Sequence, residues 1–170
     1  ARRGAVCAAE RQRGGEQAGD DAAAARRAVD ALAPFQPGQL PVAHVHRKDD
    51  TKVVICLDVD GPEEQATVLK ELAPDAKRIT VVREVWTLSV GPDASVDATL
   101  VPSEHPDRKT MTWVESLSRY GTLKRLYRVE TRDGAERVSP RPYTDEYKVR
   151  GVDNAEVKAF HHGDVFDGVW

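Results

Sequence analysis

Two histidines spaced two positions apart, His44 and His46, could together bind a metal ion. They lie in a short apolar run that indicates a strand, and two aspartates follow closely. Side chains two apart on a strand share a face, so both imidazoles could reach one divalent cation. A third ligand would come from His105 or from the pair at 161–162. The alternative is that both histidines lie on the solvent face of an edge strand and bind no metal.

A second group of reactive side chains lies in the loop 102–108, which contains Glu104, His105, Asp107 and Arg108. Acid, imidazole and guanidinium groups held together could bind an anion or transfer protons. The alternative is that the prolines and Asp107 form turns, while Glu104 and Arg108 make a surface ion pair of little energetic weight.

The apolar run at 52–58 ends in Asp58-Val-Asp60-Gly, with a proline at position 62. This string is similar to the first motif of the haloacid dehalogenase superfamily of phosphotransferases, although Pro62 stands where that motif usually has Thr or Val. The resemblance implies that Asp58 is a nucleophile, that Asp60 is an acid/base, and that Mg²⁺ lies between protein and substrate. The alternative is architectural: Asp58 ends a strand and Asp60 caps a helix.

A wider pattern covers about residues 60–130. It consists of a helix beginning Pro-Glu-Glu-Gln, a strand with Glu84-x-Trp86, and the string Pro-Ser-Glu-His-Pro-Asp-Arg at 102–108, followed by another strand. This order resembles a group of small, functionally uncharacterised proteins from bacteria and their phages. The resemblance implies an α+β fold and no particular activity.

The C-terminal stretch from Phe160 to Trp170 carries aromatic, Gly-Asp, aromatic, Gly and Trp positions in turn. It is similar to the hairpin of a MORN repeat, with Phe in place of Tyr. One repeat cannot bury its own face, so this interpretation predicts further hairpins beyond Trp170. The alternative is a single hairpin whose aromatic side chains complete the main core.

The chain divides at residues 34–41, a stretch whose prolines and glycine mark a linker. Before it, residues 1–19 have hardly any large apolar side chains and are predicted to be a disordered tail. Residues 20–33 have high helix propensity but few apolar side chains, so we expect a loosely attached N-terminal helix. Residues 42–170 are predicted to form a single α+β domain.

That domain is expected to contain a mostly antiparallel sheet of about five strands and one covering helix at 62–73. The strands are predicted at 52–58, 78–90, 109–118, 122–131 and 136–139, with a further short strand at 42–46. The long strand is apolar on both faces, which a bulge near Arg83 and Glu84 would explain. Asp133-Gly134 predicts a hairpin turn, and 139–154 is predicted to be irregular.

The predicted core consists of large apolar side chains on the helix and strands. Its members are Val54, Ile55, Leu57, Leu69, Leu72, Ile79, Val81, Trp86, Leu88, Trp113, Leu117, Leu123, Tyr127 and Val129. Cys56 lies among them and is expected to be a buried thiol, so with Cys7 in the tail no structural disulfide is expected.

The charge balance argues against one class of partner. There are 25 basic and 28 acidic residues, dispersed along the chain, for a formal net charge of −3. This field is too weak to hold a polyanion by counterion release, so there is no strong nucleic-acid signal. No apolar run approaches the roughly 20 residues that span a bilayer, so no transmembrane segment is expected. A reducing, cytoplasmic location fits the cysteine usage.

Because no catalytic constellation is complete, we expect a non-enzymatic accessory or interaction protein of bacterial or phage type, without a cofactor. Its partner is expected to be a protein, bound at an exposed sheet edge or at the 102–108 loop. One alternative is a Mg²⁺-dependent phosphohydrolase using Asp58 and Asp60. The other is a scaffold or membrane-associated protein with a MORN-type repeat at its C-terminus.

Overall fold

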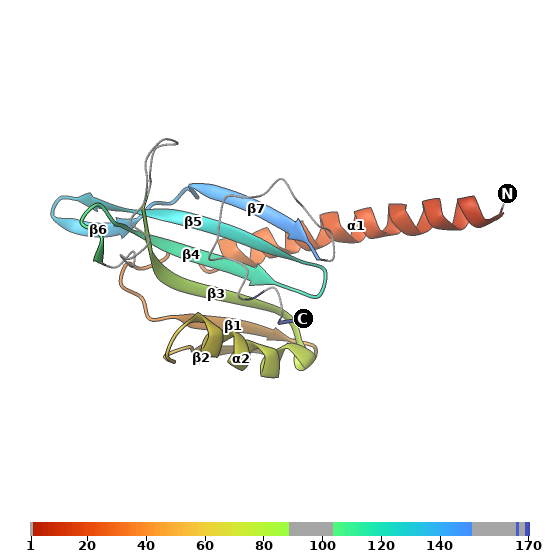
Figure 1. Ribbon diagram of the computed structural model, residues 1–170, viewed down its shortest axis with the longest axis horizontal. Coiled ribbons are helices and arrows are strands. Elements are labelled where there is room, and N and C mark those ends of the chain that lie inside the picture. The colour runs from red at the N-terminus through yellow and green to blue at the C-terminus, as the bar shows by residue number, and fades with distance from the viewer. Residues whose placement is uncertain (1, 89–103, 151–165, 167–168) are drawn as a thin grey trace.

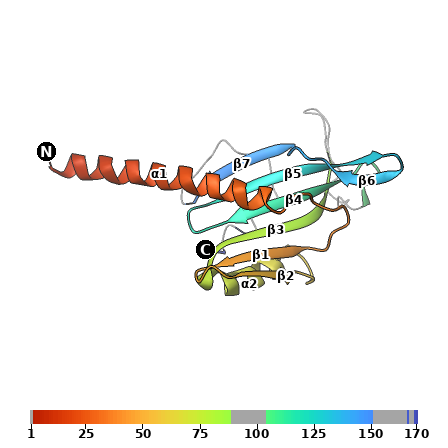
Figure 2. The same cartoon turned by 180° about the vertical axis from the view of Figure 1, so that it is seen from behind.

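The computed structural model describes residues 2–88, 104–150, 166, 169 and 170, with side chains from residue 15 onward (Figure 1). In chain order its elements are α1 (Arg2–Asp30), β1 (Val42–Arg47), β2 (Lys52–Cys56), α2 (Pro62–Leu72), the 3₁₀ turn η1 (Ala73–Asp75), β3 (Ala76–Thr87), β4 (Lys109–Leu117), β5 (Gly121–Arg132), β6 (Ala135–Val138) and β7 (Thr144–Val149). The two helices lie on opposite faces of one sheet, as the two opposed views show (Figures 1 and 2).

Within the described residues the sheet has seven strands in the order β2-β1-β3-β4-β5-β6, with β7 also paired to β5. These pairs are antiparallel, and β6 and β7 take different halves of β5. The α+β prediction is therefore confirmed, and the estimate of about five strands is too low. The five predicted strands overlap β2 to β6. The count of five did not include β1, which was predicted as a further short strand at 42–46. Strand β7 was not predicted, because the prolines and glycine that flank it indicated a loop.

A core lies on each face of the sheet. Leu69 of α2 packs with Ile79 and Val81 of β3 on one face, and Val29 of α1 packs with Val82 on the other. Strand β3 is apolar on both sides because both sides are covered. The predicted bulge at Arg83 and Glu84 is wrong: β3 and β4 keep one register from Ile79 to Thr87. The register shift lies instead between His46 and Arg47.

The predicted core is correct in the middle of the sheet and wrong at its margins. Eight predicted core residues are buried: Leu57, Leu69, Ile79, Val81, Trp113, Leu117, Leu123 and Tyr127. Four are half-buried: Ile55, Leu72, Leu88 and Val129. Val54 and Trp86 are 61% and 51% exposed, and Cys56 is also exposed rather than buried. Val54 and Cys56 are exposed because they lie on β2, the outermost of the described strands on that side.

The N-terminal helix is longer and more firmly attached than predicted. It begins at Arg2, so residues 2–19 are helical where a disordered tail was predicted, and it ends at Asp30 rather than at 33. Ala25 and Val29 are fully buried against the sheet, where α1 packs on β4 and β5. The stretch 34–41 also contacts the sheet, since the ring of Phe35 lies 5.0 Å from that of Tyr127.

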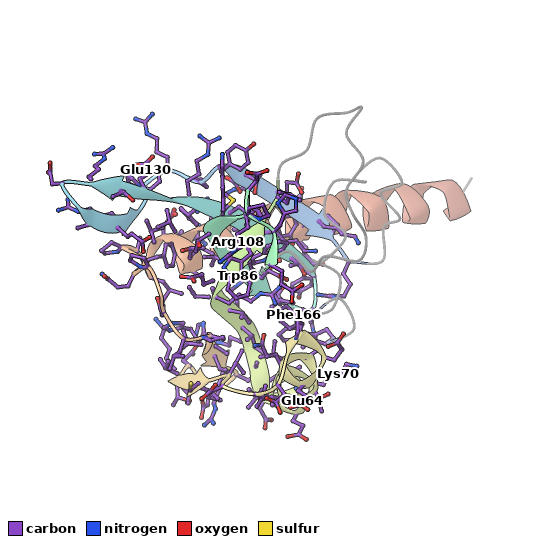
Figure 3. All side chains as sticks on the ribbon, turned by 60° about the vertical axis from the view of Figure 1, so that its left-hand side comes forward. Glu64, Lys70, Trp86, Arg108, Glu130 and Phe166 are labelled. Carbon is purple, nitrogen blue, oxygen red and sulfur yellow. The ribbon has the colours of Figure 1, made fainter. Side chains whose placement is uncertain are left out.

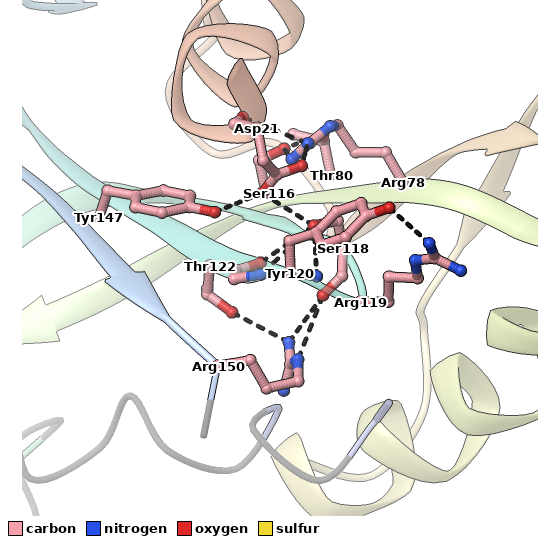
Figure 4. A network of polar contacts seen from close by, with 11 residues as sticks. Asp21, Arg78, Thr80, Ser116, Ser118, Arg119, Tyr120, Thr122, Tyr147 and Arg150 are labelled. Carbon is pink, nitrogen blue, oxygen red and sulfur yellow. Dashed lines mark hydrogen bonds and ion pairs between the residues drawn. The ribbon is translucent and has the colours of Figure 1, made fainter. Parts of the chain in front are cut away.

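A buried polar network joins α1 to the sheet (Figure 4). Asp21 accepts hydrogen bonds from three side chains, those of Arg78 in β3, Ser118 after β4 and Tyr147 in β7. Arg78 also donates to the Ser116 hydroxyl at 3.1 Å. Asp21 and Arg78 are each about nine-tenths buried, so neither charge has much access to water. The pair therefore sets the position of α1 on the sheet.

We predict that Asp21→Ala destabilises the fold by roughly 3–5 kcal/mol, because it leaves the buried Arg78 guanidinium without its counter-ion. The neighbouring Asp20 is exposed, so Asp20→Ala is a matched control that should change the free energy of unfolding by less than about 0.5 kcal/mol. Urea denaturation of both variants measures the difference. Equal stability of the two variants would show that the Asp21 network does not hold the helix.

Gly121, the first residue of β5, lies opposite Val149 of β7. A Cβ atom at this position would meet the hydroxyl oxygen of Tyr147 and lie 2.5 Å from the carbonyl oxygen of Lys148. Tyr147 cannot easily move away, because its hydroxyl is bound to Asp21. Glycine is therefore required here by the packing of β7.

We expect Gly121→Ala to cost roughly 1–3 kcal/mol through overpacking against β7. The same substitution at Gly19 meets no atom within 4 Å and lies inside α1. There it should stabilise the protein by roughly 0.5–1 kcal/mol through helix propensity. Thermal unfolding of the two variants shows whether each substitution raises or lowers the stability. A stabilising Gly121→Ala would refute the close contact between Gly121 and β7.

Candidate functional site

Strand β2 forms one outer edge of the described sheet. Among the described strands it pairs only with β1, and its residues alternate between exposed and half-buried. Lys52, Val54 and Cys56 are the exposed members. An outer strand can pair with a further strand through the backbone N–H and C=O groups that point away from the sheet. The residues that direct these groups outward are therefore the ones that could bind an added strand.

The hydrogen bonds at the two ends of the β1–β2 pair fix that direction. Leu57 N–H donates to the Pro41 carbonyl, and Arg47 N–H donates to the Thr51 carbonyl. Because bonded pairs alternate along an antiparallel ladder, residues 53 and 55 also point their N–H and C=O groups toward β1. Residues 52, 54 and 56 then direct theirs away from the sheet. The same three residues are the exposed ones.

Exposed apolar side chains lie on β2 and near its C-terminal end. The described residues include five large apolar side chains that are clearly exposed: Leu40, Val54, Val59, Trp86 and Tyr143. Three of these, Val54, Leu40 and Val59, lie on β2 or close to its end. The Leu57 N–H donates to the Pro41 carbonyl, and Leu40 and Val59 are near these two residues in the chain. An exposed apolar group beside open backbone groups is typical of a binding edge.

The two ends of β2 have opposite charge. After the strand come Asp58, Asp60, Glu63 and Glu64, with no basic residue until Lys70 on α2 (Figure 3). Before it come Arg47, Lys48, Asp49 and Asp50, and the strand itself begins with Lys52. Lys77 of β3 adds a positive charge there and binds the Asp50 carboxylate. This hydrogen bond and the positive charge of Lys77 lower the pKa of Asp50.

The strand β7 differs, because α1 engages it. Tyr147 donates to Asp21, and Asp145 accepts from both Arg26 of α1 and Arg125 of β5. Burial lowers the pKa of Arg125, but its hydrogen bonds to Asp145 and Asp30 outweigh this and raise it. Apart from Asp145, the residues of β7 are half-buried. Of the two strands, β2 is therefore the more open.

The sequence-predicted carboxylates Asp58 and Asp60 are both exposed and follow β2. The prediction that Asp60 caps the helix through its side chain is wrong: Gly61 is the N-cap, and no side chain caps it. Instead the Asp60 backbone N–H donates to Glu64 in the first turn, at 3.2 Å. The positive φ of Gly61, 112°, lets the chain turn sharply into α2.

His44 and His46 lie on β1, which is an interior strand rather than the edge that the alternative interpretation assumed. Burial lowers the pKa of His44. The Nε2 atom of His46 lies 3.2 Å from the Asp50 carboxylate, which Lys77 also binds. Within the described ranges no three His, Cys, Asp or Glu side chains are close enough to hold a metal ion. The pair at 161–162 lies outside those ranges.

The loop before β4 is held by local hydrogen bonds. Asp107 N–H donates to Nδ1 of His105 at 3.1 Å, and both the backbone and the guanidinium of Arg108 donate to the His105 carbonyl. These bonds bring His105, Asp107 and Arg108 together, with Glu104 exposed beside them. Lys109 pairs with Thr87, so the loop ends next to the exposed Trp86 (Figure 3).

One cluster was missed from the sequence. The Arg83 guanidinium lies between two rings, 5.5 Å from that of Trp113 and 5.1 Å from that of Phe166, with the Glu115 carboxylate 3.7 Å away. Burial lowers the pKa of Arg83, and the charge of Glu115 opposes this effect. The sequence did contain a sign of this cluster: Arg83 alternates with Ile79 and Val81 on the same apolar face of β3. Through Phe166, the cluster joins the C-terminal residues to the sheet.

The C-terminal pattern is described only in part. Phe166 and Val169 are buried and Trp170 packs beside them on the α2 side of the sheet. The remainder of the MORN-like stretch lies outside the described residues. No helix in the described part of the chain is both long enough and apolar enough to cross a membrane.

We predict that proline is tolerated at position 54 but not at 53. The Val54 N–H faces away from β1, so Val54→Pro removes no bond within the sheet, whereas Val53→Pro removes one. Val53→Pro should therefore unfold at a lower urea concentration than Val54→Pro. We expect its free energy of unfolding to fall by roughly 1–3 kcal/mol more. The reverse order would mean that the outward residues have been assigned incorrectly.

No known protein family matches this chain, and comparison with curated proteins and with solved structures found no significant similarity. The resemblances to haloacid dehalogenases, to the bacterial and phage group, and to a MORN repeat therefore stay predictions. Function is inferred from the contacts, burial and charges of the chain itself.

Proposed function

We propose that this chain is a non-enzymatic interaction protein that binds another polypeptide by adding a strand to β2. The observation that carries this proposal is the outward direction of the backbone groups of Lys52, Val54 and Cys56 on the exposed edge. In strand addition the main chain supplies hydrogen bonds, and alternate side chains supply specificity.

The binding energy available at this edge is modest. Three residues each offer one N–H and one C=O, so an added strand can form up to six hydrogen bonds. At roughly 0.5–1.5 kcal/mol net for each bond, and after the cost of association, binding in the micromolar to millimolar range is expected. Val54 would contribute apolar contact at the centre of the added strand. Such an affinity suits a reversible accessory interaction.

The sheet edge is a better candidate than the loop 104–108. The ring of His105 and the guanidinium of Arg108 already make hydrogen bonds within the loop. A ligand would have to compete with those bonds, whereas the outward groups of β2 face away from the other described strands. The carboxylates Asp58 and Asp60 enter this proposal as charges at the end of the edge.

We predict that a displayed library of random nine-residue peptides, selected on the full chain, yields extended segments rich in β-branched residues. Bound peptide should slow hydrogen exchange at the amides of residues 52, 54 and 56, because these N–H groups become bonded. Val54→Pro should weaken binding at least about tenfold, since it removes the central donor, while Val54→Thr, which keeps the N–H and the β propensity, should bind normally. Peptides that bind Val54→Pro and the parent protein equally would refute strand addition at β2.

A further inference from the structure

The β2 edge is complementary to itself, and we infer that a second copy of this chain occupies it. The two copies pair antiparallel about a two-fold axis at Val54 and join their sheets into one. This inference rests on the proposed function, since it names the strand that is added. Three properties of the edge support it: its backbone groups, its apolar side chains and its charges.

The backbone groups match completely in this arrangement. With Val54 opposite Val54 of the second copy, Lys52 lies opposite Cys56 of the other chain on both sides of the axis. All three residues direct their N–H and C=O groups outward, so these are the bonded pairs of the new ladder. Three N–H groups from each copy make six hydrogen bonds, which satisfy every outward group of β2.

The side chains then form apolar rows on both faces. On one face the exposed Val54 side chains of the two copies lie next to each other, which covers the largest exposed apolar group on this strand. On the other face Val53 lies opposite Ile55 of the second copy, and both residues are half-buried in the single chain. Cross-strand pairs of β-branched residues stabilise a sheet.

The charges select the antiparallel direction. An antiparallel partner brings the acidic end of β2, with Asp58 and Asp60, toward the other copy's end that carries Lys48 and Lys52. A parallel partner would instead bring the two acidic ends together. Of the two aspartates at the basic end, Asp50 already has Lys77 as its counter-ion. In this register Asp60 lies opposite Lys48 and Asp58 lies opposite Asp50. The basic end keeps a net positive charge, since Arg47, Lys48, Lys52 and Lys77 outnumber Asp49 and Asp50, so the acidic end of one copy meets a positive end of the other.

The size of this contact predicts a weak dimer. A strand of five residues covers much less area than the roughly 1,200–2,000 Å² buried in a stable interface. Dimerisation should therefore depend on protein concentration in the micromolar range or above, and it should weaken as salt screens the charged ends.

Sedimentation equilibrium of the full chain, from low micromolar to several hundred micromolar at low salt, tests the inference. We expect reversible dimer formation, and a dissociation constant at least about tenfold higher for Val54→Pro, which removes the central donor on both chains. A chain that stays monomeric throughout, or a Val54→Pro variant that dimerises like the parent, would overturn the inference.

A charge exchange provides the matched test and leaves the backbone donors of the strand in place. Lys48→Glu with Lys52→Glu, and separately Asp58→Lys with Asp60→Lys, should each weaken self-association at least about tenfold. Mixing the two double variants should restore pairing as a heterodimer, because the first then has acidic side chains at both ends of its edge and the second gains basic ones. If the mixture stays monomeric while the parent dimerises, the antiparallel pairing at β2 is wrong.

The peptide selection separates this inference from the proposed function. Peptides that bind at residues 52–56 of a chain that stays monomeric would leave strand addition standing and exclude the second copy as occupant. Failure of both peptide binding and self-association would reject the edge as an interaction site.

Discussion

The buried ion pair between Asp21 and Arg78 is the contact on which the arrangement of the molecule depends. Arg78 lies on β3, inside the sheet, where its charge has little access to water. A buried guanidinium needs a carboxylate from another element to compensate it, and α1 supplies Asp21. This contact places α1 over β4 and β5, away from β2, as Figure 2 shows. Among the described strands, the position of the helix thereby leaves β2 more open than β7.

The strands β2 and β7 are consequently unequal. On β7, Tyr147 and Asp145 are bound to α1, and burial together with the Asp21 carboxylate raises the pKa of Tyr147. On β2 the outward backbone groups lie beside exposed side chains. Natural sheets usually protect such edges with charges, proline or short length. Here the strand is short and carries one lysine, yet it leaves a valine exposed at its centre, and this combination is why we propose β2 as the interaction site.

Several residues that suggested chemistry have structural partners instead. Glu64 accepts a hydrogen bond from the Asp60 backbone N–H at the start of α2, and His46 lies within hydrogen-bond distance of Asp50. His105 accepts a hydrogen bond from the Asp107 backbone within its own loop. Arg83, which the sequence suggested only as the place of a bulge, contacts two aromatic rings and anchors Phe166. In a small domain, polar side chains near strand ends satisfy neighbouring backbone groups, which accounts for these pairings.

Local patterns in the sequence were enough to identify most strands, the helix α2 and the Asp133-Gly134 turn, whose two residues both have positive φ. These features depend on side-chain alternation and on turn chemistry within a few residues. The sequence could not predict that Val54 and Trp86 are exposed, that Asp21 is buried, or that β2 is the outermost strand. A period of two reveals a strand and its faces, but the neighbours that cover those faces come from distant parts of the chain. Only the tertiary structure decided, therefore, which backbone groups of β2 face outward and which side chains lie beside them.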